Sequence, residues 1–161
     1  MKISFFGAAD TVTGSRHLVH IGGQSILLDC GLFQGFKVHR ERNWAPLAVP
    51  AREIDAVVLS HAHIDHSGWL PVLVKQGFRG PIYAPAATRD LTEVMLLDSA
   101  HLQEDDARRA NHGGWSKHHP ALPLYDATQA RRAIAKIVPV AAGRNLAVLT
   151  EAATRMHLLR S

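Results

Sequence analysis

The chain has 161 residues, of which 47% are hydrophobic and 20% charged, with a formal charge of +4 and a pI near 9.6. This balance predicts a folded domain with a core, and no apolar run is long enough to cross a membrane. Cys30 is the only cysteine, which excludes an internal disulfide and a cysteine-based zinc cage. We interpret it as a small buried hydrophobe.

The N-terminal third predicts strands joined by glycine-rich connections. Residues 2–6 form the first expected strand, and Asp10 interrupts the apolar stretch too early for a secretory signal, so we expect a cytoplasmic protein. Residues 16–21 and 24–29 are two apolar runs separated by Gly22-Gly23, a combination that predicts a hairpin. A long loop containing a short helix is expected over residues 31–50.

The next part of the chain alternates between strand and helix patterns. The short apolar run at residues 56–60 predicts a buried strand, and residues 68–76, followed by Gly77, predict a short helix. Another strand is expected at residues 81–84. Apolar residues at helical spacing then predict a long amphipathic helix from residue 88 to about 110.

A second helix is expected after the loop at residues 116–125. It opens at Asp126, which forms a capping-box pattern with Gln129, and runs to about Ile137. Weak strands are expected near Val138 and Leu146. Early strands followed by mixed strands and helices predict an α/β layered fold.

The most informative segment is His61-Ala-His63-Ile-Asp65-His66, directly after the expected strand at residues 56–60. On an extended segment, side chains two residues apart point the same way, so His61 and His63 can reach one cation. A turn towards the following helix redirects Asp65 and His66 to a second point nearby. Four ligand-type side chains would then serve two adjacent ions.

The mixture of imidazole and carboxylate suits zinc, and also manganese or iron, and zinc is the metal we expect. Two such ions can bridge a water and lower its pKa, which yields a hydroxide able to attack an ester or amide. The alternative is that these histidines line a surface loop or satisfy hydrogen bonds in the core. Their spacing after a buried strand favours the metal site.

This segment matches the signature H-x-H-x-D-H, and the sequence resembles the metallo-β-lactamase superfamily. The stretches FFGAADTVTGSRHLV and SILLDCGLFQG further resemble the N-terminal part of the β-CASP RNA-processing branch, which includes RNA endonucleases and exonucleases. The resemblance covers residues 1 to about 135. It implies roughly the N-terminal half of an αββα sandwich, with RNA as the partner.

The resemblance also implies roles for single residues. His61 and His63 would bind one metal, and Asp65 and His66 the other, with Asp65 also the catalytic residue. Asp29 occupies the place of the family's first motif and would orient the metal loop from behind the ligands. The alternative reading of Asp29 is a turn residue at a strand end.

The C-terminal end departs from the family pattern. Family members are longer, and they carry a later metal-binding histidine in a GH-(I/L)-LGS-like stretch, followed by a bridging aspartate and an inserted β-CASP domain. His157 lies in a degenerate version of that stretch and is the candidate fifth ligand, or else an ordinary terminal residue. We expect residues 1–161 to form a partial domain with one exposed sheet face.

Three functions are compatible with these observations. The first is a metal-dependent phosphodiesterase acting on RNA, which the branch resemblance favours. The second keeps the metal site but acts on a small thioester or lactam. The third is a non-catalytic remnant, which the short C-terminal end favours.

Overall fold

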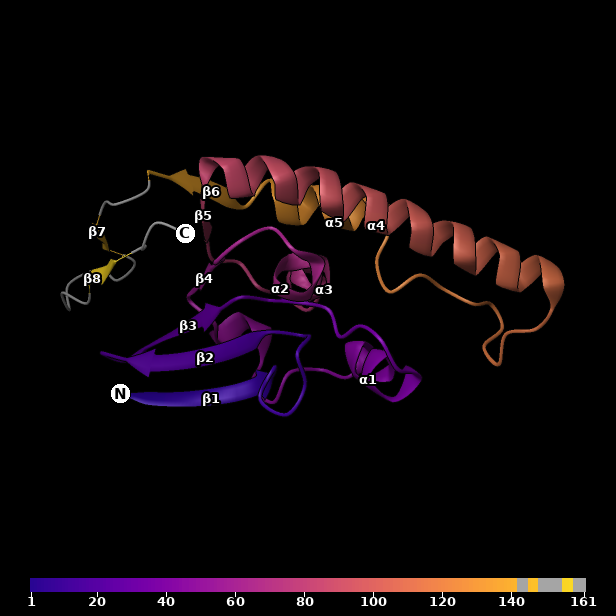
Figure 1. The fold of residues 1–161 in the computed structure, drawn as a ribbon, viewed down its shortest axis with the longest axis horizontal. Helices are drawn as coiled ribbons and strands as arrows, with labels where there is room; N and C mark the ends of the chain where they lie inside the picture. Colours follow the sequence, from indigo (N-terminus) through magenta and orange to yellow (C-terminus); the bar gives the residue numbers. More distant parts are fainter. Residues whose placement is uncertain (142–144, 148–154, 158–161) are drawn as a thin grey trace.

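The fold is a mixed α/β structure in a computed structural model that describes residues 1–141, 145–147 and 155–157, with side chains through residue 141 (Figure 1). The strands are β1 (Lys2–Gly7), β2 (Arg16–Ile21), β3 (Gln24–Leu28), β4 (Ala56–Val58), β5 (Ile82–Pro85), β6 (Ile137–Val140), β7 (Asn145–Ala147) and β8 (Arg155–His157). The α-helices are α1 (Lys37–Glu41), α2 (Ile64–Ser67), α3 (Leu70–Lys75), α4 (Ala86–Gly113) and α5 (Ala127–Ile134), and two 3₁₀ turns lie at Arg42–Trp44 and Ala51–Glu53.

Six strands form one sheet in the order β1-β2-β3-β4-β5-β6. The first three pair antiparallel, and β3, β4, β5 and β6 pair parallel. The predicted hairpin is confirmed, since Gly22 and Gly23 join β2 to β3 with φ values of 58° and 79°, which glycine adopts without a steric penalty. The parallel strands are connected by segments that carry the helices, as parallel pairing requires.

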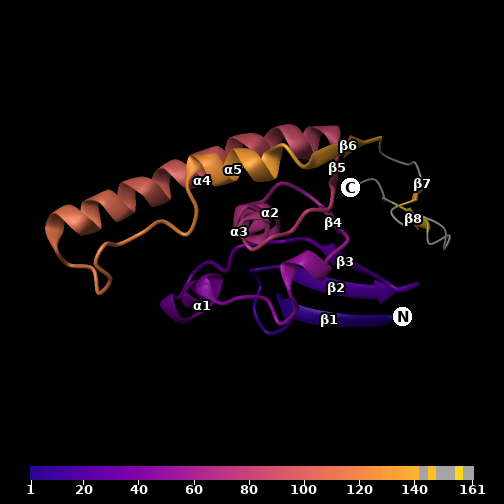
Figure 2. The ribbon, with the colours of Figure 1, turned by 180° about the vertical axis from the view of Figure 1, so that it is seen from behind.

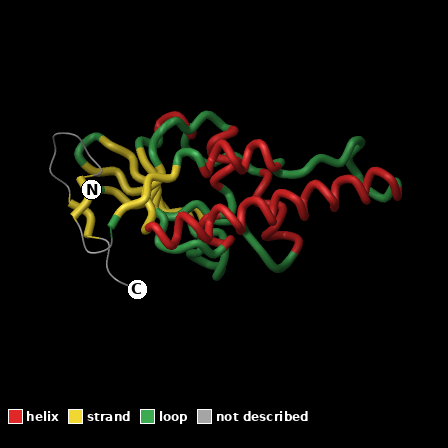
Figure 3. Tube along the Cα trace, turned by 90° about the horizontal axis from the view of Figure 1, so that it is seen from above, coloured by secondary structure: helices red, strands yellow, loops and turns green. Residues whose placement is uncertain are grey.

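The helices gather on one side of this sheet, as Figure 3 shows with strands and helices separated. The side chains beneath them form the main core; its largest fully buried members are Leu18, Leu27, Val57, Leu59, Trp69, Leu70, Leu73, Phe78, Ile82, Leu96 and Tyr125. Alternate residues of the same strands point to the opposite face, because successive side chains of a strand alternate. The core therefore lies between the sheet and the helical layer.

The opposite face carries a smaller apolar group. Ile26 and Val58 are buried there, with Leu28 and Tyr83 packed beside them. Through the pairing of Phe5 with His17, the same face continues onto β1, where the Phe5 side chain is 62% exposed. In the described part of the chain no helix packs on this face.

The two longest predicted helices are present, α4 at Ala86–Gly113 and α5 at Ala127–Ile134. The apolar face expected on α4 is only partly right, because Leu91, Val94 and Leu102 are exposed, and the buried residues are Thr92, Leu96, Ala100 and Ala110. The capping box of α5 is also present: the Asp126 carboxylate accepts from the Gln129 N–H, and the Gln129 side chain accepts from the Asp126 N–H. The far end of α4 extends beyond the sheet, and the following loop returns along it (Figure 1, Figure 2). Within the described residues no helix is both long and apolar enough to cross a membrane.

The short helix expected at residues 68–76 is wrong in its bounds. The structure has two helices there, α2 and α3, with Gly68 and Trp69 between them. Helix α2 begins at Ile64, within the motif, so that Asp65 and His66 lie in its first turns rather than in the loop before a helix. Pro71, which fits the first turn of a helix, marks the new start.

Candidate metal centre

The motif lies at the edge of the sheet where β3 and β4 both end. These strands are parallel, so their carboxyl ends meet at one edge. Asp29 follows β3 directly, and Ser60 and His61 follow β4 after one residue. The chain then enters α2, for which His63 is the residue preceding the first turn. This topology brings Asp29 to the motif, although about thirty residues separate them in the sequence.

The three histidine rings of the motif lie against one another. The ring centroid of His61 is 4.0 Å from that of His66 and 4.7 Å from that of His63. Partial burial lowers the pKa of His61, and the neighbouring His66 and His63 lower it further. A lowered pKa favours the neutral imidazole, which is the form that binds metals.

Asp29 supports the motif through hydrogen bonds to its carboxylate. Its carboxylate accepts hydrogen bonds from the Ser60 N–H at 2.7 Å and the Ser60 hydroxyl at 2.9 Å. The same carboxylate lies 2.8 Å from His66 Nδ1. An ionised carboxylate can only accept, so Nδ1 donates to Asp29 and Nε2 is the ring nitrogen left for a metal. That Nε2 lies 3.5 Å from an Asp65 carboxylate oxygen.

Backbone hydrogen bonds fasten α2 to the segment after β3. The Cys30 N–H donates to the His66 carbonyl at 2.7 Å, and the Leu32 N–H donates to the Ile64 carbonyl at 3.0 Å. Gly31 lies between these two contacts. A Cβ placed on it would lie 1.6 Å from the Asp65 carbonyl oxygen, far inside contact distance. Only glycine therefore permits the segment to approach α2 this closely.

The donor chemistry fits a metal, since imidazole and carboxylate groups stand together and one imidazole is fixed with its free nitrogen towards a carboxylate. Among the residues whose side chains the structure describes, however, no three His, Cys, Asp or Glu side chains are grouped so that they could hold an ion. The structure thus brings the four predicted ligands into one neighbourhood. Their sharing of cations stays a prediction.

A sequence profile described as the metallo-beta-lactamase superfamily matches residues 12–141. The chain belongs to this superfamily. The family resemblance seen in the motif is thereby confirmed, and with it the α/β fold class.

Curated relatives extend the similarity beyond the superfamily signature. The chain is 50% identical over 105 residues to "Ribonuclease TTHA0252" of Thermus thermophilus, an alignment that covers 65% of this chain and 24% of the relative. It is 34% identical over 116 residues to "Integrator complex subunit 11" of Danio rerio, covering 69% and 19%. The chain thus spans about a quarter or less of the length of these relatives.

Among solved structures, the metallo-beta-lactamase fold protein YhfI from Bacillus subtilis is 30% identical, with a TM-score of 0.37, over 53% of this chain and 38% of that one.

Of the other residues in this superfamily member, His157 and Cys30 were singled out from the sequence, and Trp69 is added by the structure. The backbone of His157 pairs with Asn145 in the two-stranded sheet of β7 and β8, and its side chain lies outside the described residues. Cys30 is fully buried, as predicted, and burial raises the pKa of its thiol to about 12. Trp69 is also fully buried, and its indole N–H donates to the Asn43 carbonyl at 2.8 Å.

Sequence reasoning missed two residues that support the motif. The Ser60 hydroxyl lies 2.9 Å from His61 Nδ1 as well as from Asp29. Arg16 is 3% exposed, donates to the Gly31 carbonyl at 2.8 Å and stacks 4.1 Å from the Trp69 ring centroid. Burial lowers its pKa to about 10. The signal was available, since strand alternation puts Arg16 on the same face as the apolar Leu18.

Proposed function

We propose that this chain carries the metal-binding part of a phosphodiesterase that cleaves RNA with two zinc ions. The observation that supports the proposal most is the contact between Asp29 and His66. It fixes the imidazole with Nε2 free and beside Asp65, at the sheet edge where the His61 and His63 rings also lie. A carboxylate that holds one ring nitrogen of a histidine, and so leaves the other to face a metal, is the usual arrangement behind a histidine ligand.

In this proposal His61 and His63 hold one ion, and Asp65 and His66 hold the other, with His157 as the candidate further ligand. A bound pair of ions supplies a hydroxide at neutral pH and stabilises charge on the attacked and departing oxygens. Asp29 keeps the proton of His66 on Nδ1, and Ser60 ties that carboxylate to the start of the motif. The hydrogen bond from the Cys30 N–H to the His66 carbonyl fixes the position of α2 relative to the sheet.

RNA is the proposed substrate because of the printed names of the curated relatives to which this chain is similar. The relatives with the printed names "Ribonuclease TTHA0252", "Transcription termination factor FttA" and "Integrator complex subunit 11" align with 65%, 61% and 69% of this chain. We place the chain in the β-CASP RNA-processing branch on this basis, as the N-terminal part of a metallo-β-lactamase domain. The superfamily motif alone would serve a lactam or thioester equally well.

The proposal is tested by metal content and by RNA cleavage in the same preparation. We expect about two zinc ions per chain after purification, and metal-dependent cleavage of an end-labelled RNA. Asp65→Ala should remove at least one ion and abolish cleavage. His101→Ala is the matched control, because His101 is an exposed histidine on α4 away from the motif.

Three results would contradict the proposal in different ways. Less than one ion per chain would point to the non-catalytic alternative. Tight metal binding with turnover of a chromogenic lactam or thioester, but none of RNA, would point to the small-substrate alternative. Cleavage that persists in Asp65→Ala would mean a contaminating nuclease.

A further inference from the structure

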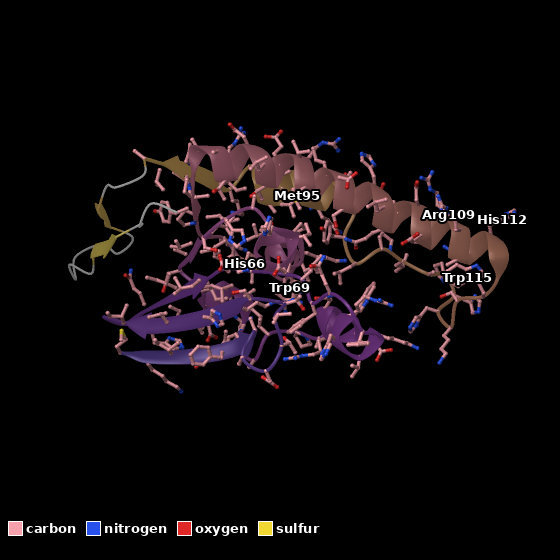
Figure 4. The ribbon with its side chains drawn as sticks, in the orientation of Figure 1. His66, Trp69, Met95, Arg109, His112 and Trp115 are labelled. Carbon is pink, nitrogen blue, oxygen red and sulfur yellow. The ribbon has the colours of Figure 1, made fainter. Side chains whose placement is uncertain are left out.

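A second surface of the molecule has features that neither core packing nor the metal motif explains. A cleft of about 610 Å³ lies between the segment that follows β3 and the far half of α4 with its returning loop. A second hollow of about 480 Å³ adjoins it and shares Trp44 and Leu122 as lining residues. Figure 4 shows Trp115 beneath the far end of α4, near Arg109 and His112.

Two of the three tryptophans of the chain line this cleft with their rings in solvent. The Trp44 side chain is 61% exposed and that of Trp115 is 70% exposed, whereas Trp69 is fully buried in the core. An indole that stays exposed does not add to folding stability the large free energy that its burial would provide. Trp44 comes from the segment that follows β3 and Trp115 from the loop after α4, so each of these two segments brings one exposed indole to the cleft.

Helix α1, beside the cleft, also contributes nothing to the core, because none of its residues is buried. It lies within a basic segment in which Phe36 is 78% exposed. Folding therefore leaves the Phe36 and Trp44 rings largely exposed, while Arg42 stacks 4.1 Å from the Phe33 ring centroid and Arg40 donates to the Gly35 carbonyl at 2.7 Å.

Arg40 lines the cleft, and two further cations, Arg42 and Lys117, are sequence neighbours of residues that line the cleft or the adjoining hollow. Arg40, Arg42 and Lys117 are exposed, and in the described part of the chain none of them forms an ion pair with a carboxylate. The acidic groups nearby are Asp106, on the α4 wall, and Glu41, which pairs with Lys37 at 3.8 Å. Unpaired cations around exposed aromatic rings match a chain of phosphates with accessible bases.

The returning loop is held in place, so the cleft is a built feature. The Asn111 side chain forms two hydrogen bonds with the Ala121 backbone, donating at 2.9 Å and accepting at 2.7 Å. The Leu124 N–H donates to the Gln103 side chain, and the Tyr125 hydroxyl donates to Ser99 at 2.8 Å. Trp115 is thereby carried on a loop anchored to α4 near its far end.

One wall of the cleft is hydrogen-bonded to the helix that carries part of the candidate metal centre. Leu32 and Phe33 form part of its wall. The Leu32 N–H donates to the Ile64 carbonyl at the start of α2, the helix that carries Asp65 and His66. A nucleic-acid strand bound in the cleft would therefore pass the Leu32 wall, whose backbone is hydrogen-bonded to Ile64 of the motif.

We infer that this cleft binds single-stranded RNA, with bases stacked on Trp44 and Trp115 and phosphates near Arg40, Arg42 and Lys117. This inference rests on the proposed function, for which it supplies a substrate-binding surface. Unpaired bases are required, because the bases of a duplex are already stacked on one another and present no free face to an indole.

The test is binding of a fluorescently labelled single-stranded RNA to the full chain in the presence of EDTA, so that no cleavage interferes. We expect Trp44→Ala and Trp115→Ala each to weaken binding about tenfold, because each removes one stacking platform. Trp44→Phe and Trp115→Phe should retain most of the affinity. RNA should also quench the tryptophan fluorescence of the native chain, since Trp44 and Trp115 are exposed.

Leu91→Ala is the control, since Leu91 is 59% exposed on α4 but does not line the cleft. Equal affinity of both alanine variants and the native chain would overturn the inference, as would equal binding of single-stranded RNA, duplex RNA and heparin. Unchanged thermal unfolding of the variants is expected and confirms that folding is intact.

The outcome is separable from that of the proposed function. Tryptophan-dependent RNA binding without metal-dependent cleavage would contradict the proposed function and support the cleft. Cleavage by the native chain, with both alanine variants binding and cleaving equally well, would contradict the cleft alone.

Discussion

The two faces of the six-stranded sheet are built from the same strands, yet they are organised in different ways. The face towards the helices carries a continuous core, from Leu18 on β2 to Ile137 on β6, in which most large side chains are fully buried. Among the described residues, the apolar group on the other face has two buried members, Ile26 and Val58, while Phe5 on β1 stays largely exposed.

This difference shows where the stability of the described fold comes from. Burial of apolar side chains between two layers supplies most of the folding free energy of a domain. Here only one face has its second layer in the described part of the chain. The helical layer is also the layer that positions the motif, through the contacts of α2 with the segment around Gly31.

Leu27 and Leu28 allow the sharpest test of the difference, because identical side chains on one strand point to opposite faces. Leu27 is fully buried in the main core, and Leu28 is only partly buried. We expect Leu27→Ala to lower the free energy of unfolding by about 3 to 4 kcal/mol, and Leu28→Ala by about 1 kcal/mol. Urea unfolding followed by circular dichroism measures both. Equal losses would mean that the two faces are equally well packed.

Gly31→Ala tests how closely α2 must pack against the segment that follows β3. The new methyl group would overlap the Asp65 carbonyl, so that α2 must move away, at a cost of about 2 to 3 kcal/mol. The hydrogen bond from the Cys30 N–H to His66 should break, and faster hydrogen exchange of the Cys30 amide would report it.

The matched control for this change is Gly35→Ala, in the same loop. Nothing lies within 4 Å of a Cβ at Gly35, although its φ of 80° disfavours alanine by about 1 kcal/mol. If both substitutions lower the free energy of unfolding by the same amount, the close approach at Gly31 does not contribute to stability.

Asp29→Asn should have a small effect on stability, about 1 kcal/mol, because asparagine tolerates the φ of 57° found at this residue. An amide that keeps the Ser60 N–H bond presents its NH₂ group to His66 Nδ1, which must then accept. The proton of His66 moves to Nε2 and blocks the proposed donor. We expect zinc affinity to fall about 10- to 100-fold.

The tautomer of His66 can be read from ¹⁵N NMR of the metal-free chain, which separates this effect from a general loss of structure. Asp29→Asn with an unchanged Nδ1–H tautomer would contradict the proposed role of Asp29.

The sequence predicted much of this fold because its strongest signals are local. The Gly22-Gly23 hairpin, the long helix α4 and the capping box at Asp126 depend on residues within a few positions of one another. The motif was recognisable for the same reason, since its six residues are contiguous. The start of α2 was missed because Ile64 and Asp65 carry no capping pattern that marks a helix there.

What the sequence by itself determined about this protein is the α/β class, the superfamily and the six-residue motif. Only the tertiary structure decided that Asp29 meets His66, that Gly31 is the point of closest approach to Asp65, and that Arg16 is buried beside them. These relations arise from the parallel pairing of β3 with β4, which brings together residues about thirty positions apart. Local patterns cannot specify which strands become neighbours, because that choice is made by the packing of the whole sheet.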